Sequence, residues 1–321
     1  MKLIFAASLH LVILLASIPL QAQTRPRGTR RPPPRPPATS VNRPESVGED
    51  EVLRVTTNLV TVPVSVRGHD GSYVFDLKQE DFRIYEDGVE QEIAHFSSVE
   101  QPFSVVLLVD TSSSTESNLG EIKEAANAFI GQLRPKDSVL PATFDGQVRP
   151  LLSKGTSSRT ILRDAVEKAR TDTGNNGTKL YDAVDYAYQV LRRISGRKAI
   201  LLFTDGDDTW SNATMRSTLC DTAELDALIY PIHYGSSPST NYLRALAGET
   251  GGRFYQADNV EMIKQSFAAV AEELRRQYSI GYYPKATSRQ QEERQLRVEV
   301  KGPAAGVTTR KSYVYRPSGG H

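Results

Sequence analysis

Hydrophobic and polar residues alternate with a period of two in the first patterned stretch of the chain. Between residues 60 and 66 every second residue is a valine, and the residues between them are polar or proline. This alternation predicts a strand with one buried face, which we place at a sheet edge because Pro63 has no N–H for a central ladder. Turn sequences at Asp70-Gly71 and Asp87-Gly88 then divide residues 53–98 into β-hairpins.

The pattern changes at residue 104 to short, unbroken apolar runs separated by amphipathic helices. Strands that are apolar on both faces are typical of a parallel sheet covered on both sides. The apolar runs are Val105–Val109, Val139–Phe144, Ala199–Phe203 and Ile229–Ile232. Between and after them, apolar stripes at helical spacing begin at Ile122, Ile161, Leu180 and Val260. The alternation predicts a doubly wound α/β domain over residues 102–275 with a mostly parallel sheet.

Beyond residue 276 the period returns to two. The strands expected there are Tyr278–Tyr282, Leu296–Val300 and Ser312–Tyr315. Neither terminal set has enough strands for a core of its own, so we expect the two sets to pair. The α/β domain is then inserted in a split β-sandwich whose halves are residues 51–101 and 276–317, and residues 318–321 form a disordered tail.

The start of the chain has the features of an export signal. Lys2 precedes an apolar run over residues 3–20, and Ala22 suits cleavage after it. We expect residues 1–22 to be a removed signal peptide; the alternative is an uncleaved membrane anchor. Residues 23–50, rich in Pro and Arg, are expected to be a disordered linker. After cleavage we expect no stable membrane span.

Composition further restricts the expected cellular compartment and the expected classes of partner. The formal net charge is +1, so no basic field attracts the molecule to nucleic acid. Cys220 is the only cysteine, and hence no disulfide can form within the chain. An exported protein without disulfides fits a bacterial periplasm or exterior. The oligomeric state is not predicted.

Oxygen-bearing side chains gather where the predicted strands end, which is where open α/β sheets bind ligands. Asp110-Thr111-Ser112-Ser113-Ser114 follows the first apolar run, Thr204-Asp205-Gly206 follows the third, and Gly177-Thr178 precedes a helix. Each piece alone has an ordinary structural explanation, because Ser and Thr cap helices and Asp-Gly forms turns. Together they place two carboxylates at one sheet edge, where they repel each other unless a cation lies between them.

These residues resemble, in type and order, the metal-ion-dependent adhesion site of von Willebrand factor type A domains. The resemblance covers about residues 102–275. It implies that Ser112, Ser114 and Thr178 give hydroxyl oxygens to a metal, while Asp110 and Asp205 approach it directly or through water. The flanking segments 80–88 and 277–282 further resemble exported bacterial proteins related to this family and frequent in acidobacteria.

The implied function is adhesion through a metal ion. Oxygen ligands without imidazole or thiolate favour Mg²⁺, Mn²⁺ or Ca²⁺ over zinc. We expect the metal to coordinate an Asp or Glu of a protein or peptide partner. Trp210, in the loop after Asp205, is either a contact at the rim of this site or an aromatic packed under its own loop.

Two alternatives to adhesion remain at this stage, a metal-assisted hydrolase and a structural envelope protein whose metal only stabilises the fold. We expect no enzyme, because Ser112 has no histidine placed to activate it. His233, at the end of a predicted strand, is expected to be a core residue.

Overall fold

The computed structural model describes residues 59–171, 177–235, 240–286, 288–302 and 304–317. The expected signal peptide (1–22), linker (23–50) and tail (318–321) lie outside these residues and stay predictions. Within the described residues, the structure contains no helix with the length and apolar character needed to traverse a lipid bilayer.

A six-stranded sheet forms the centre of the α/β region, in the order β10-β9-β8-β5-β6-β7. Its strands are β5 (Phe103–Asp110), β6 (Ser138–Phe144), β7 (Val148–Pro150), β8 (Arg197–Thr204), β9 (Leu228–Tyr234) and β10 (Tyr255–Ala257). All pairings are parallel except that of β6 with β7. The predicted α/β class with a mostly parallel sheet is confirmed.

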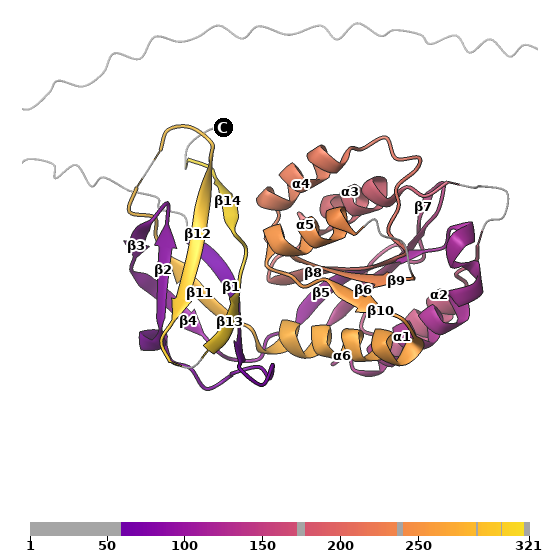
Figure 1. Cartoon of the computed structure of the whole chain (residues 1–321), viewed down its shortest axis with the longest axis horizontal. Coiled ribbons are helices and arrows are strands. Elements are labelled where there is room, and N and C mark those ends of the chain that lie inside the picture. Colours follow the sequence, from indigo (N-terminus) through magenta and orange to yellow (C-terminus); the bar gives the residue numbers. More distant parts are fainter. Residues whose placement is uncertain (1–58, 172–176, 236–239, 287, 303, 318–321) are drawn as a thin grey trace, which may run out of the picture. The chain divides into compact units, whose positions relative to one another are not determined.

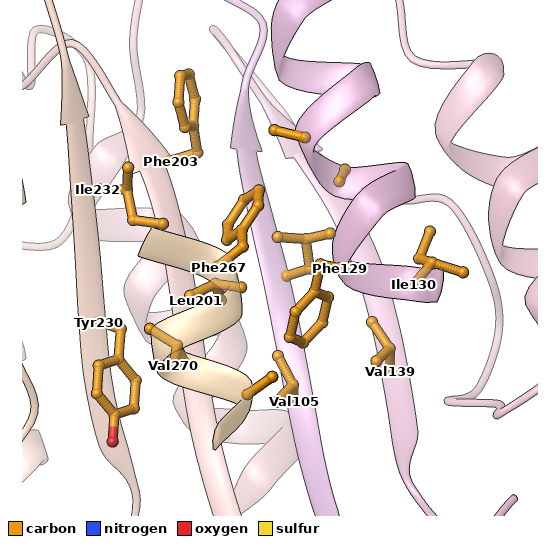
Figure 2. Close-up of a cluster of buried hydrophobic side chains, with 14 of the residues drawn as sticks. Val105, Phe129, Ile130, Val139, Leu201, Phe203, Tyr230, Ile232, Phe267 and Val270 are labelled. Atoms are coloured by element: carbon orange, nitrogen blue, oxygen red, sulfur yellow. The ribbon is translucent and has the colours of Figure 1, made fainter. Parts of the chain in front are cut away.

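Helices cover both faces of this sheet (Figure 1). One face packs against α1 (Leu119–Gly131), α2 (Arg159–Glu167) and α6 (Val260–Arg276), and the other against α3 (Leu180–Leu191), α4 (Met215–Glu224) and α5 (Asn241–Thr250). Figure 2 shows how Phe129 of α1 and Phe267 of α6 meet over the strands, with ring centroids 5.7 Å apart. Because the strands are buried on both faces, they are apolar without alternation.

The direction of chain winding reverses between β5 and β8. β5 pairs with β6 on one side and with β8 on the other, whereas α1 and α4, which follow β5 and β8, lie on opposite faces. At such a switch point the loops after the two strands diverge and leave a crevice at their carboxyl ends. Those loops begin at Asp110 and Asp205, so the topology places both residues at the switch point.

The remaining strands form two four-stranded antiparallel sheets, ordered β13-β1-β11-β4 and β14-β12-β2-β3. The N-terminal strands are β1 (Val60–Gly68), β2 (Phe82–Glu86), β3 (Val89–Gln91) and β4 (Ile93–Ser97), with a 3-10 helix η1 (Gln79–Asp81) before β2. The C-terminal strands are β11 (Tyr278–Tyr282), β12 (Glu292–Val300), β13 (Ala304–Thr308) and β14 (Ser312–Tyr315). β1 pairs with β11, and β2 with β12, so the expected pairing of the two terminal sets is confirmed.

The predicted edge position of β1 is wrong for the strand as a whole. β1 lies between β11 and β13, but the two neighbours pair with different parts of it: β11 pairs with residues 60–64 and β13 with residues 65–68. Pro63 therefore faces only one ladder, which is how an internal strand accommodates a residue without an N–H.

Polar contacts join the β strands to α6. Glu273 of α6 is buried and accepts a hydrogen bond from the hydroxyl of Tyr73, and Arg67 lies 3.7 Å from the same carboxylate. Gln277, directly after α6, donates from Nε2 to Ser65 Oγ of β1 at 3.3 Å. The last helix of the α/β region is thus fixed at its C-terminal end.

Candidate metal site

Asp110 is the last residue of β5 and has no solvent-exposed surface. Ser112 donates its N–H to Oδ1 at 2.9 Å, Thr204 donates its hydroxyl to Oδ2 at 2.7 Å, and the Ser112 hydroxyl is a third hydrogen-bond partner of this carboxylate. A carboxylate has about four lone-pair sites, so it can accept a further partner.

The two serines after Asp110 approach each other at the start of the 3-10 helix η2 (Ser113–Asn118). Ser112 Oγ and Ser114 Oγ are 3.1 Å apart. Thr115 fixes this turn by donating its hydroxyl to the Asp110 carbonyl at 3.0 Å and to the Ser112 carbonyl at 2.9 Å. A short, hydrogen-bonded turn therefore directs two hydroxyl groups to one place beside Asp110.

Asp205 begins the loop after β8 and is partly exposed. The preceding residue, Thr204, is bonded to Asp110 and also accepts the Gly206 N–H at 3.1 Å. His233 of β9 is almost fully buried, with Nε2 2.9 Å from the Asp205 carbonyl and Nδ1 3.0 Å from Gln256 Oε1. A carbonyl only accepts, so Nε2 is the donor of this hydrogen bond.

Thr178 is held against the loop after β8 by hydrogen bonds of its main chain. Its carbonyl accepts the N–H groups of Thr209 and Trp210, at 2.9 and 3.1 Å, and its own N–H donates to Thr209 Oγ1 at 2.8 Å. These bonds tie Thr178 to the loop that Asp205 begins. The side-chain oxygens of Asp110, Ser112 and Ser114 are joined by hydrogen bonds with one another and with Thr204.

Burial raises the pKa of Asp110 to about 7, hydrogen bonds from Ser112 oppose this shift, and the charge of Asp205 adds to it. The two carboxylates are thus close enough to repel each other, as expected from their positions at the strand ends. A cation between them removes that repulsion.

The donor chemistry of these residues fits a small divalent cation. Across the residues that the structure covers, no three His, Cys, Asp or Glu side chains could together hold a metal ion. A metal at this site would therefore need oxygens besides the two carboxylates, and the hydroxyls of Ser112 and Ser114 lie beside Asp110. Hard oxygen donors of this kind suit Mg²⁺, Mn²⁺ or Ca²⁺.

Several supporting residues were not predicted. Thr204, Thr209 and Thr115 hold the candidate ligands in place, and His233, expected only to fill the core, is bonded to the main chain of Asp205. The sequence contains one usable signal for Thr204, namely its position directly before Asp205 at a strand end.

Residues 104–269 match the family model of the von Willebrand factor type A domain. Comparison with curated proteins finds no match. A solved structure of a von Willebrand factor type A protein from Catenulispora acidiphila is similar at a TM-score of 0.51 and 14% identity, over 73% of each chain. Proximal thread matrix protein 1 from the mussel byssus, in a structure with a zinc-occupied MIDAS motif, has a TM-score of 0.51 and 16% identity. That match covers 60% of this chain and 50% of the mussel chain, so this chain spans about half the mussel protein structure.

Proposed function

The chain belongs to the von Willebrand factor type A domain family, and from this premise we propose that it is an exported, metal-dependent protein-binding module. Asp110, Ser112, Ser114, Thr178 and Asp205 hold one divalent cation, Mg²⁺ or else Mn²⁺ or Ca²⁺. The cation, when bound, supplies a coordination position for an Asp or Glu carboxylate of a partner protein or peptide.

The observation that carries this proposal is the crowding of two carboxylates and two hydroxyls at the switch point between β5 and β8. Thr204 links the two strand ends by donating to Asp110, and Ser112 and Ser114 place their oxygens 3.1 Å apart beside it. A buried carboxylate with a second carboxylate nearby is costly without a counter-charge. The arrangement is therefore preorganised for a cation.

The candidate ligands contribute to metal binding in different ways. Asp110, held through both oxygens, fixes one side of the site, and the partly exposed Asp205 closes the other. Neutral hydroxyls complete the set without adding negative charge. With the metal bound, the site is less negative than one built from carboxylates alone. It therefore attracts an acidic group of a partner more strongly.

Export belongs to this proposal on the basis of the apolar run at residues 3–20, and we place the protein in a bacterial periplasm or exterior. The segments 80–88 and 277–282 support a relationship to the exported bacterial group that is frequent in acidobacteria.

The first experiment measures metal binding by calorimetry. We expect the wild-type protein to bind one Mg²⁺ per chain, and Asp205→Asn to weaken that affinity at least about tenfold, equivalent to about 1.4 kcal/mol. Asp207→Asn, two residues along the same loop, removes the same charge and serves as the control. We expect it to change the affinity by less than about threefold, because the charge of an exposed side chain is screened.

The second experiment tests partner binding. Immobilised wild-type protein is incubated with native envelope extract in MgCl₂ or EDTA, in parallel with Asp205→Asn. We expect partners to be retained only by the wild type and only with Mg²⁺. If EDTA lowers the melting temperature but every partner is retained, the metal is structural. If Mg²⁺ supports hydrolysis of phosphate or ester substrates that Asp110→Asn abolishes, the protein is a hydrolase.

A further inference from the structure

Trp210 is a large aromatic side chain that stays exposed beside the candidate metal site. It is the only tryptophan of the sequence, and 54% of its surface is accessible. The backbone N–H of Trp210 donates to the carbonyl of Thr178, one of the five candidate ligands, at 3.1 Å. Its loop follows directly from Asp205, a second candidate ligand, so Trp210 lies at the rim of the site.

The loop of Trp210 is fixed in place by several hydrogen bonds to the start of α3. Asp208 Oδ1 accepts the Tyr181 N–H at 3.1 Å, and Asp182 Oδ1 accepts the N–H groups of Asn212 and Ala213 at 2.9 and 2.8 Å. The anchors lie on both sides of Trp210. The position of its backbone is therefore set before any partner binds.

The indole ring of Trp210 packs against Gly177. A β-carbon on Gly177 would lie 2.2 Å from Cδ2 of Trp210, so one side of the ring rests where any other residue would have a side chain. The glycine immediately before Thr178 thus packs one part of the ring and leaves the rest exposed. A held aromatic of this kind gains contact area on binding at little cost in conformational entropy.

The exposed part of the indole favours an apolar group on the partner over a charged one, because burying such surface removes it from water.

We infer that the site selects acidic residues that have a large apolar neighbour, and that Trp210 is the residue that determines this specificity. The inference rests on the proposed function: the partner's carboxylate occupies the metal position, and an apolar side chain one or two residues away packs on the exposed part of the indole. Adjacent Cα atoms are about 3.8 Å apart, so such a neighbour reaches the rim while the carboxylate stays in place.

The test uses an array of short Gly/Ser peptides with one central Asp. The positions beside the Asp carry Leu, Phe, Ser or Lys, and the full chain is applied in MgCl₂ or EDTA. We expect Mg²⁺-dependent binding of all peptides that contain Asp, with Leu and Phe neighbours preferred over Ser by about tenfold. Fluorescence of Trp210, the only indole, provides a second readout of contact.

Variants separate the rim from the metal site. Trp210→Ala is expected to lose the preference for Leu and Phe, measured as the ratio of affinities for Leu- or Phe-flanked and Ser-flanked Asp peptides within the variant. Trp210→Phe is expected to restore part of that preference. Ile161→Ala serves as a control for nonspecific apolar adhesion, because Ile161 is 49% exposed on α2 and lies outside the loops of the site.

The possible results distinguish failure of the inference about Trp210 from failure of the proposed function. If Asp peptides bind with Mg²⁺ but show no preference for Leu and Phe, prefer Lys, or keep an apolar preference in Trp210→Ala, the inference is overturned and the proposed function stands. If no Asp peptide binds in a Mg²⁺-dependent way, the proposed function fails and the inference fails with it.

Discussion

Asp110 and Asp205 are two carboxyl groups in different surroundings. Asp110 is fully buried and accepts hydrogen bonds from Ser112 and Thr204, whereas Asp205 is partly exposed. Asp110→Ala removes the acceptor of two buried donors, which costs stability regardless of any metal. Loss of folding in that variant would therefore say little about metal binding, and Asp205 is the better position for testing it.

His233 is predicted to position the Asp205 loop. Its buried Nε2–H donates to the Asp205 carbonyl at 2.9 Å, and Phe254 stacks on its ring at 6.3 Å. His233→Phe keeps an aromatic ring but removes the donor, so we expect Mg²⁺ affinity to fall by about tenfold or more, as is typical when an outer-shell partner is lost. Calorimetric Mg²⁺ titration at one fixed pH measures the effect.

The matched control for His233 is Gln256→Leu, which removes the partner of Nδ1 and leaves the Nε2 bond to Asp205 intact. We expect a smaller loss of Mg²⁺ affinity in this variant. Equal affinities in His233→Phe and the wild type would show that the histidine only fills the core.

At the residue scale, the sequence indicated the candidate ligands but not the residues that hold them in place. Asp110 and Asp205 could be placed at one sheet edge because each follows an apolar strand. The role of His233 depends on the parallel register of β8 and β9, in which His233 is the partner of Thr204. Apolar periodicity does not reveal such a register, because most residues of these strands are buried on both faces.

The helices differ in how clearly their sequences predict them. α1, α2, α3 and α6 have apolar stripes and were expected. α4 was missed because it is mostly polar and begins with a capping box at Thr214 and Ser217 instead of an apolar face. α5 was also missed, although its buried residues follow helical spacing and Gly251, at φ +76°, ends it. Ile161, expected in the buried stripe of α2, is exposed.

The C-terminal end of α6 is also held by an arginine of β8. Arg197 donates to the carbonyls of Leu274 and Arg275, at 2.9 and 2.6 Å, and also to that of Gln277. These carbonyls belong to the end of a helix, where intrahelical partners are missing. Arg197→Met is therefore expected to lower the free energy of unfolding by about 2 kcal/mol, measured by urea denaturation.

Arg297→Met on β12 is the control for the Arg197 variant. Arg297 is exposed and pairs with Glu299, so we expect a change within about 0.5 kcal/mol. If Arg197→Met is as stable as Arg297→Met, the end of α6 is held by other contacts.

At the scale of the whole molecule, the split β-sandwich and the inserted α/β region were both predictable from the change in apolar period along the chain. Their junction was not, because it is built from polar residues such as Tyr73, Arg67 and Glu273 that are far apart in sequence. The sequence bounds of the signal peptide and linker stay predictions.

This junction predicts a pH dependence of stability. Burial raises the pKa of Glu273 above its ordinary value, although hydrogen bonds from Tyr73 and Ser65 oppose the shift. The folded state then binds a proton more tightly than the unfolded state, so its contribution to stability is complete below the ordinary value near about 4.3 and is lost as pH rises through the folded value. Glu273→Gln should flatten this decline, measured by urea denaturation over a pH series.

Glu272→Gln is the matched control for the pH series, because Glu272 is the preceding residue of α6 and is exposed beside Arg276. Its profile should follow the wild type. Parallel profiles for the wild type and Glu273→Gln would mean that the carboxylate at the junction does not titrate differently on folding.

The central claim is that a single cation is held by oxygens from three loops at the end of the sheet. Anomalous diffraction from crystals soaked in Mn²⁺ tests it most directly. We predict one strong peak among Asp110, Ser112, Ser114, Thr178 and Asp205, with direct ligand oxygens at about 2.2 Å. A protein with Mn²⁺ bound elsewhere, or with none bound among these five side chains in saturating Mn²⁺, would contradict it.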